Sequence, residues 1–296
     1  MTADPLGGAI TVATVADVPD RRARRGSPRR RAAWLRFILV TAFAVVVLVP
    51  VGTVLLLALH PSSSGTSDLS GWTLDAFGIL STTNIPHALL NNLMVSVAAT
   101  VLSVAVGACG GYVVSRSKGR AVPAYSASLF IIQALPVIVF VIPLFVLFAR
   151  IALVDSLTGI VIVYVAAGVA VNTWIMAAYF DTIPVALEEA AWIDGCSRFG
   201  GFFRIMLRNA TPGLLSAAVF SFLLSWNDYL AAAVFLKSDD VKTMPVAIQQ
   251  FFQQTGADWA SIMASAVLMI IPPLVVFVVL GRRLSLGGLG GSLAGK

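Results

Sequence analysis

Charged residues are scarce in this sequence, and their scarcity excludes an ordinary soluble domain. Only 11% of the 296 residues are Asp, Glu, Lys or Arg, whereas 58% are hydrophobic. A soluble domain carries about 25% charged residues, so these few charges could not give a core this apolar a polar surface. Lipid must therefore replace water around much of the chain, and we predict a single integral membrane domain that is all α-helical.

Histidine and cysteine are also rare, which argues against a metal centre or a catalytic site. The chain has two of each, His60, His87, Cys109 and Cys196. One cysteine lies in a long apolar run and the other in a polar loop, and no group of His, Cys and carboxylate residues has metal-ligand spacing. We therefore predict no disulfide, no metal site and no catalytic residues in this chain.

Long apolar runs predict six membrane-spanning helices. Such a helix needs roughly 20 apolar residues to cross about 30 Å of hydrocarbon. Pro136 and Pro143 fall within the third run, where we expect them to kink or locally unwind the helix. The predicted spans, which together form a domain over residues 34–283, are 34–59, 88–114, 126–150, 158–180, 212–236 and 259–281.

Basic residues gather in alternate loops, and this distribution predicts the orientation. Of the 20 Lys and Arg residues, 17 lie in the N-terminal tail and the start of the first span, the 115–125 turn, the central polar loop at 181–211, or residues 282–296. The positive-inside rule places these segments in the cytoplasm, so both termini are predicted to be cytoplasmic. We expect residues 1–33 to be a disordered basic tail that touches membrane lipid and residues 284–296 to be a second tail. The distribution is an orientation signal and does not indicate a nucleic-acid partner.

The central polar loop has the pattern of two short helices joined by a sharp turn. Pro184 is typical of a first helical position, and Gly195 of a helix stop, because glycine adopts a left-handed conformation without steric cost. Ser197 can cap the second helix. Two interpretations stay open, a hairpin on the lipid headgroups or a hairpin that contacts another protein. Small residues such as Ala190 and Ala191 favour the second.

The same loop carries a spaced motif. It reads Glu189-Ala190-Ala191, then Gly195 after three residues, Ile205 after nine and Leu207 after one. This pattern resembles the EAA motif of permease subunits in bacterial ATP-binding cassette (ABC) importers, and the spacing matches at every position. The family usually has proline after the leucine, where this chain has Arg208.

The resemblance extends over residues 34–296 and is closest to sugar permeases of the maltose-transporter type. It implies the type I ABC importer permease fold in the bacterial cytoplasmic membrane. The other segments that carry the resemblance are Asn91-Asn92-Leu93, Ile183-Pro184, Ser225-Trp226-Asn227-Asp228, Arg283-Leu284 and Gly287-Gly288-Leu289-Gly290-Gly291.

A set of partners follows from this resemblance. It implies a homologous second permease subunit, two copies of a cytoplasmic ATPase subunit that bind ATP and Mg, and an extracytoplasmic solute-binding protein. Residues 184–194 would form a coupling helix seated in the ATPase, whose nucleotide cycle would drive alternating access and import of a di- or oligosaccharide. The residues that the resemblance assigns to coupling are Glu188, Glu189, Ala190, Ala191, Asp194, Gly195, Ile205 and Leu207.

Polar side chains within the spans are candidates for the substrate path, although each has a structural alternative. An ionised carboxylate in a membrane costs a few kcal/mol and usually faces protein or a cavity, so Asp228 marks either a path or a structural hydrogen bond. Uncharged polar groups often join helices instead. The candidates are Asn91, Asn92, Gln133, Asn172, Trp226, Asn227 and Asp228. In the 237–257 loop, which we expect on the outer side, candidates for contact with the binding protein are Gln249, Gln250, Gln253 and Gln254; a solvated loop is the alternative.

Three other functions are alternatives to this one. A stand-alone secondary transporter would be expected to show further membrane carboxylates or repeated halves, and the sequence shows neither. An intramembrane enzyme would need a nucleophile–base or metal set. A permease of the same family that imports glycerol phosphate or another polyol remains the nearest alternative.

Overall fold

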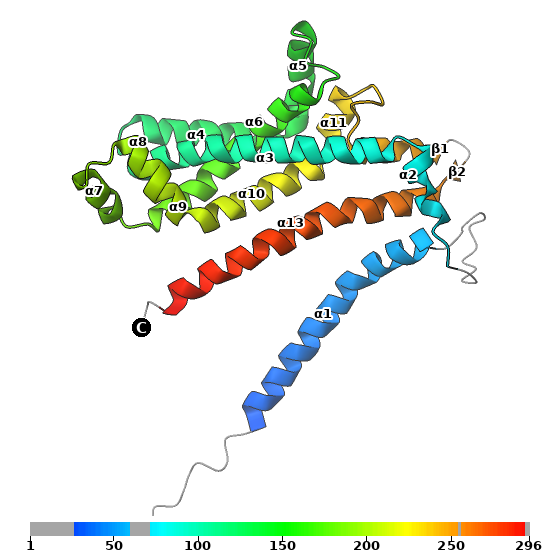
Figure 1. Cartoon of the computed structure of the whole chain (residues 1–296), viewed down its shortest axis with the longest axis horizontal. Coiled ribbons are helices and arrows are strands. Elements are labelled where there is room, and N and C mark those ends of the chain that lie inside the picture. The colour runs from blue at the N-terminus through cyan, green and yellow to red at the C-terminus, as the bar shows by residue number, and fades with distance from the viewer. Residues whose placement is uncertain (1–26, 60–71, 254–255, 294–296) are drawn as a thin grey trace, which may run out of the picture. The chain divides into compact units, whose positions relative to one another are not determined.

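The structure is a computed structural model that describes residues 27–59, 72–253 and 256–293 (Figure 1). Three parts of the sequence-based predictions fall outside these residues. They are most of the N-terminal tail (1–26), the candidate contact residue Gln254, and the last three residues of the C-terminal tail (294–296).

The described residues are almost entirely helical. The only strands among them, β1 (Phe252–Gln253) and β2 (Gly256–Ala257), form a small antiparallel pair. The helical elements are α1 (Ser27–Leu59), η2 (Asp75–Gly78), α2 (Ile79–Thr82), α3 (Ile85–Arg116), α4 (Ala121–Ala134), α5 (Val137–Arg150), α6 (Leu157–Asp181), α7 (Ala186–Ile193), α8 (Arg198–Gly201), η3 (Phe202–Met206), α9 (Leu207–Asn209), α10 (Thr211–Trp226), α11 (Leu230–Phe235), α12 (Met244–Ala247), η4 (Ile248–Phe251) and α13 (Trp259–Leu293).

Four of the described helices are long and apolar enough to cross a membrane on their own. Two further pairs of helices pass the same test only together, because each pair is bent, so the described residues hold four to six candidate spans. The single helices are Ala33–Leu59, Ile85–Arg116, Leu157–Asp181 and Trp259–Gly281; the pairs are Ala121–Ala134 with Ile138–Arg150 and Arg198–Asn209 with Thr211–Trp226. The prediction of an all-helical chain with several membrane spans is confirmed, while the side on which each terminus lies stays a prediction.

The third predicted span, 126–150, is not one kinked helix. The helix begins earlier, at Ala121, and ends at Ala134, and α5 then leaves at an angle of 98°. Leu135 and Pro136 are both extended, with ψ of 133° and 132°. A proline disfavours the helical conformation of the residue before it, so Pro136 ends one helix and begins the next.

The fifth predicted span, 212–236, is also interrupted. Helix α10 ends at Trp226, and α11 begins only at Leu230. The Asp228 carboxylate lies in the gap and accepts hydrogen bonds from the backbone N–H groups of Ala231 and Ala232, at 3.1 and 3.2 Å. It also accepts one from the Tyr164 hydroxyl at 3.0 Å. A carboxylate at a helix N-terminus is stabilised by the unpaired N–H groups there, so this geometry favours the structural interpretation of Asp228.

Close contact between α3 and α6 forms the centre of the packed helices. A Cβ atom added to Gly107 would lie 2.4 Å from the Asn172 Cβ, and one added to Gly111 would lie 2.7 Å from the Met176 Cβ. Small residues of this kind let two membrane helices approach until their backbones touch. Asn172 in addition donates to the Ser103 hydroxyl of α3 at 3.1 Å and accepts from the Ser221 hydroxyl of α10 at 3.0 Å, so one buried amide joins three helices.

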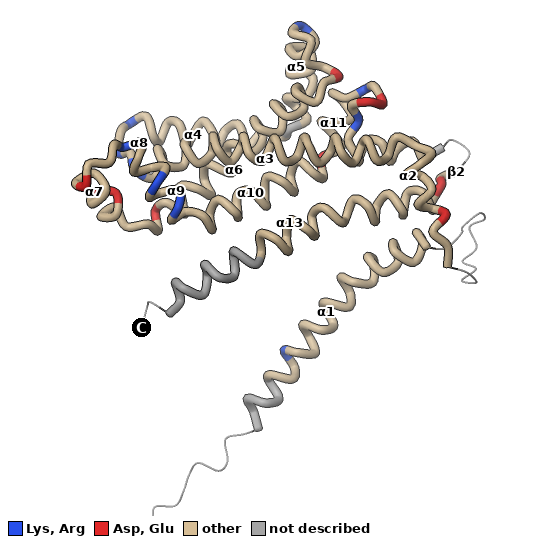
Figure 2. The backbone as a smooth tube through the Cα atoms, in the orientation of Figure 1, with Lys and Arg blue, Asp and Glu red and all other residues tan. Residues whose placement is uncertain are grey.

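Charges lie at the ends of this helix group. Lys, Arg, Asp and Glu gather at α7 to α9 and around the residues after α11, whereas the tubes of α3, α6 and α10 between them are almost free of charge (Figure 2). This separation is what a lipid-embedded middle and two water-exposed ends require.

Gly107→Ala should lower the stability of the protein by about 1–3 kcal/mol, the usual cost of overpacking a filled interior. The added methyl group would meet the Asn172 Cβ at 2.4 Å and the Asn172 carbonyl carbon at 3.0 Å. The midpoint of thermal unfolding in detergent measures the effect. Gly119→Ala is the control, since nothing lies within 4 Å of its added Cβ. Equal midpoints for the two variants would contradict the close approach of α3 and α6.

Candidate functional site

The loop that joins α6 to α10, called the hairpin here (residues 181–211), contains the turn that the sequence predicts. Helix α7 ends at Ile193, and Gly195 follows in the left-handed region with φ of +87°. The Ser197 hydroxyl accepts from the Gly200 N–H at 3.1 Å and begins α8. Both predictions are confirmed. The first helix begins two residues later than expected, because Pro184 and Val185 form the turn that precedes it.

The second half of the hairpin packs against the ends of α3 and α6. It runs from α8 through the π-helical turn η3 into α9, and then bends by 75° into α10. Phe202 and Met206 are buried in a cluster with Phe180 and Ile183. Of the motif residues in this half, Leu207 packs against the same cluster and Ile205 is half-buried. The hairpin is therefore anchored to the helix group by its second half.

Two neighbouring glutamates of α7 have opposite environments. Glu188 is only 2% exposed, and its two carboxylate oxygens accept from Arg116 Nε at 2.5 Å and from the Tyr112 hydroxyl at 2.7 Å. Arg116 also donates through Nη2 to the Ile183 carbonyl at 2.8 Å. Glu189, one residue on, is exposed. The sequence analysis assigned both glutamates to ATPase coupling, because nothing in the neighbouring sequence distinguishes a buried glutamate from an exposed one.

The pairing of Glu188 with Arg116 fixes the orientation of α7. A buried ion pair gains little over a well-packed apolar pair, but removing one partner usually costs about 3–5 kcal/mol because the other charge is left buried alone. Helix α7 must therefore turn Glu188 inward toward α3. The opposite face then points away from the chain.

That opposite face is apolar and acidic, and no described residue covers it. Ile193 is 86% exposed and Leu187 is 44% exposed, and Ala190 and Asp194 are exposed beside Glu189. Ala191, in contrast, is buried. Exposed apolar side chains on a short helix outside the membrane-spanning segments are typical of a protein-binding surface.

Most of the polar candidates for a substrate path are used inside the chain. Asn172 joins three helices, Asp228 caps α11, and Trp226 is fully buried with its indole N–H donating to the Met269 carbonyl at 3.1 Å. Asn91 and Asn92 are both 1% exposed. The Asn92 side chain donates to the Trp226 carbonyl at 3.3 Å. The structure does not bring these groups together at a common surface.

The two exposed candidates are Gln133 and Asn227. Gln133 lies two residues before the break at Leu135. Asn227 lies in the break after α10 and lines an apolar cavity of about 540 Å³ between α10 and α13, with Leu223 and Met269 among its other walls.

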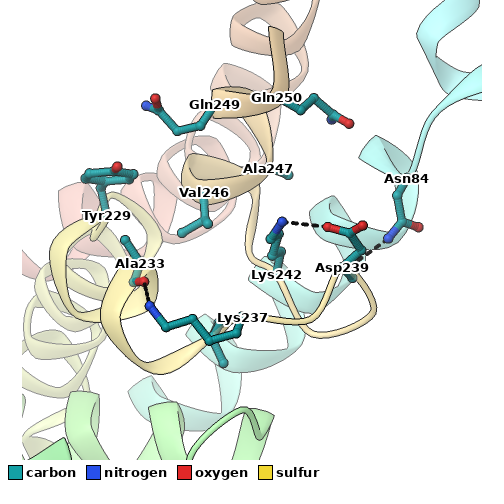
Figure 3. Close-up of a pocket in the computed structure, with 11 residues that line it drawn as sticks. Asn84, Tyr229, Ala233, Lys237, Asp239, Lys242, Val246, Ala247, Gln249 and Gln250 are labelled. Atoms are coloured by element: carbon teal, nitrogen blue, oxygen red, sulfur yellow. Dashed lines mark hydrogen bonds and ion pairs between the residues drawn. The ribbon is translucent and has the colours of Figure 1, made fainter. Parts of the chain in front are cut away.

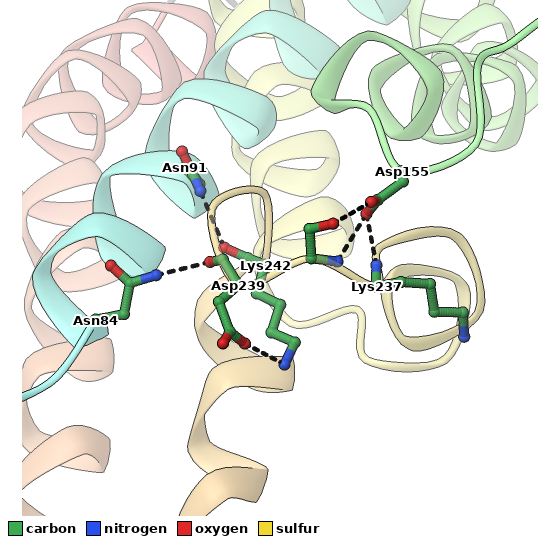
Figure 4. A network of polar contacts seen from close by, with 7 residues as sticks. Asn84, Asn91, Asp155, Lys237, Asp239 and Lys242 are labelled. Carbon is green, nitrogen blue, oxygen red and sulfur yellow. Dashed lines mark hydrogen bonds and ion pairs between the residues drawn. The ribbon is translucent and has the colours of Figure 1, made fainter.

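At the other end of α3 from the hairpin, three side chains hold residues 237–242, called the outer segment here. Figure 4 shows two of them, Asn84 and Asn91. Asn84 donates to the Asp239 carbonyl at 2.7 Å. His87 Nε2 lies 2.9 Å from the Asp240 carbonyl. Asn91 donates to the carbonyls of Asp240 at 2.8 Å and Lys242 at 3.1 Å. The sequence singled out Asn91 as a path candidate, but its amide instead fixes this segment.

The outer segment is held from a second side by Asp155, in the turn before α6. Its carboxylate accepts from the backbone N–H groups of Lys237 and Ser238 at 2.7 and 2.9 Å, and from the Ser238 hydroxyl. The Ser238 hydroxyl, and then these N–H groups, hold the pKa of Asp155 below its ordinary value of 3.8. Sequence reasoning missed this residue, because its partners lie some 80 positions away.

A polar cavity of about 480 Å³ opens beside the outer segment (Figure 3). Gln249 and Gln250, both exposed, line it, as do Tyr229 and the two lysines of the segment. Lys242 pairs with Asp239 at 2.5 Å, and Lys237 donates to the Ala233 carbonyl at 2.8 Å. Gln253 follows in β1.

Asp155→Asn should destabilise the protein at pH 7, with a loss that disappears in acid. A carboxyl group whose pKa is lowered in the folded state stabilises it above the unfolded pKa, and this contribution is lost as the pH falls through the folded pKa. The gap between wild-type and variant unfolding midpoints should thus shrink below about pH 4. Asp75→Asn, at an exposed position in η2, is the control. A gap that stays constant from pH 7 to pH 3 would contradict the ionised contact.

Comparison with known proteins gives the chain a family. The model of the family described as binding-protein-dependent transport system inner membrane component matches residues 104–286. The trehalose transport system permease protein SugB of Mycobacterium tuberculosis is 31% identical over 277 residues, which cover 90% of this chain and 99% of that protein. A putative ABC transporter permease protein, ORF1 of Streptomyces antibioticus, is 34% identical over 209 residues, 71% of this chain and 91% of its own length.

Further likenesses point the same way. The diacetylchitobiose uptake system permease protein DasC of Streptomyces coelicolor is 28% identical over 205 residues, 69% of this chain and 74% of that protein. Among solved structures, a bacterial ABC transporter involved in the import of the acidic polysaccharide alginate superimposes with a TM-score of 0.73 and 21% identity. That match covers 87% of this chain and 98% of that one, and at this identity it establishes the fold alone.

Proposed function

Since this chain belongs to the family of inner membrane components of binding-protein-dependent transport systems, and is therefore an ABC importer permease of the bacterial inner membrane, we propose that it imports a di- or oligosaccharide. Relatives named for trehalose and diacetylchitobiose transport support a carbohydrate cargo. The family is one of transport permeases, so the energy source lies in another subunit. We assign ATP and Mg binding to that ATPase.

The exposed face of α7 is the observation that carries the coupling proposal. A short helix that presents Ile193, Leu187 and Glu189 to the outside, while Glu188 fixes its orientation from behind, has the form of a protein contact. We assign this face to the ATPase. Moving a transporter between states from about 1:99 to 99:1 takes about 5.5 kcal/mol, and a helix locked by a buried ion pair can transmit such a load without turning.

The remaining partners are assigned to the other surfaces. A second, homologous permease would complete the transport path. Asn227 and Gln133 would be the exposed polar groups that this chain contributes to that path. The solute-binding protein would dock at the end that carries the outer segment, where the cavity lined by Gln249 and Gln250 offers amide and ammonium groups for hydrogen bonding.

Glu189→Lys should weaken association with the ATPase, because it reverses the charge of an exposed group on the contact face. The measurement is the amount of ATPase that co-purifies with the tagged permease. Asp75→Lys makes the same charge change in η2, at the end of α3 away from the hairpin, and should leave the yield unchanged. Equal yields for wild type and Glu189→Lys would remove this glutamate from the contact.

The assembled transporter should take up a sugar only with ATP. A thermal-shift panel of disaccharides, oligosaccharides, glycerol phosphate and polyols on the binding protein identifies the cargo, and uptake into proteoliposomes then tests it. This chain alone should move no sugar. Uptake by the chain alone would favour a stand-alone transporter, and a shift only with glycerol phosphate or a polyol would change the cargo.

A further inference from the structure

We propose that α3 links the hairpin to the outer segment, with Glu188–Arg116 as the joint at one end and Asn84, His87 and Asn91 as the joint at the other. Motion that enters at α7 would thereby reach residues 237–242 through one helix. This inference rests on the proposed function, because it concerns how a load on α7 crosses the membrane.

The joint at the hairpin end is made by side chains and not by the chain itself. The hairpin leaves α6 through the short non-helical segment 182–185. The backbone hydrogen bonds there are those of isolated turns, so this segment by itself is not stiff. Arg116 spans this turn, since it donates both to Glu188 of α7 and to the Ile183 carbonyl. The two contacts lie on either side of Pro184. They hold the turn and α7 to the last residue of α3.

The joint at the other end uses one face of α3. Asn84, at the N-cap, and His87 and Asn91, in the first two turns, are spaced three and four residues apart and therefore share a side of the helix. All three contact backbone carbonyls of residues 239, 240 and 242. Because these contacts are to backbone carbonyls, residues 239–242 are bound to α3 independently of their own side chains.

Between its two joints α3 is stiff. It is one continuous helix of 32 residues, about 48 Å long, and its second half packs closely against α6 through Gly107 and Gly111. The routes through α10 and through α4 and α5 are interrupted. Helix α10 stops at Trp226 before α11, and α4 and α5 meet at 98°. Helices α3, α6 and α13 each run unbroken, and α3 is the one whose side chains, among the described residues, contact both α7 and residues 237–242.

The test uses the complete transporter in nanodiscs. Its ATPase rate is measured with and without the sugar-loaded binding protein, and the ratio reports coupling between the two ends. Glu188→Gln removes the charge of one joint without changing its size, and Asn91→Leu removes the amide of the other. With the rate expressed per assembled complex, we expect each variant to lower the ratio by about fivefold or more, the lower range of allosteric coupling, and we expect Asn91→Leu to keep ATPase assembly and the basal rate. Arg116→Lys and His87→Phe are milder variants if either first choice fails to fold.

A double variant separates a shared route from two independent effects. If α3 is the route, Glu188→Gln with Asn91→Leu should lower the ratio no further than the stronger single change; independent effects would multiply. Exchanging the pair, as Glu188→Arg with Arg116→Glu, should recover part of the ratio, which a general loss of stability would not allow. Asp75→Asn, at an exposed position in η2 that belongs to neither joint, is the control.

The possible results distinguish a failure of this inference from a failure of the proposed function. Wild-type ratios in both single variants, or multiplied losses in the double variant, would overturn the role of α3 and leave the proposed function intact. A wild-type complex that binds no ATPase, or whose rate ignores the binding protein, would overturn the proposed function itself.

Discussion

The backbone contact between α3 and α6 is the constraint on which the rest of the structure depends. In lipid, apolar helices gain little from hydrophobic burial against each other, so association relies on close packing and hydrogen bonds. Gly107 and Gly111 remove the side chains that would hold the helices apart, and Asn172 then reaches both Ser103 and Ser221. With this pair fixed, both ends of α3 become fixed points to which the hairpin and the outer segment are attached.

The hairpin shows how such a fixed point determines a functional surface. On a helix, residues i and i+1 point about 100° apart, so burying Glu188 against Arg116 turns Glu189 outward. The ion pair contributes little net stability, because burying its two charges has a desolvation cost. Its role is to fix the orientation of α7. A helix of eight residues with small and apolar side chains could rotate by one position at low cost, whereas moving Glu188 out of register would leave Arg116 and Tyr112 without their shared carboxylate.

The sequence predicted those structural features that depend only on a residue and its near neighbours in the chain. Gly195 ends α7 through its own backbone conformation, and Ser197 caps α8 through its own side chain. The long apolar runs likewise identified the membrane helices. What the sequence could not give depends on partners far along the chain. Glu188 is buried because Arg116 lies opposite, Asp228 interrupts the fifth span with the help of Tyr164, and Asp155 is bound by residues more than 80 positions on. Pro136 indicated a disturbance in the third span, but the 98° turn is larger than a kink.

The fate of the polar residues in the spans narrows what this chain can contribute to sugar recognition. Asn91, Asn92 and Asn172 are buried and donate to protein groups inside the chain, although no described residue donates to Asn92 Oδ1. The exposed amides, Gln133 and Asn227, both lie at interruptions of helices. Broken membrane helices offer unpaired backbone groups where a polar substrate can bind. At the break near residue 227 the Asp228 carboxylate already binds two N–H groups, and Asn227 Nδ2 donates to the Leu223 carbonyl. Under the proposed function, the exposed Gln133 side chain and the Asn227 Oδ1 are therefore the groups with which this chain would meet its cargo, and selectivity beyond them would fall to its partners.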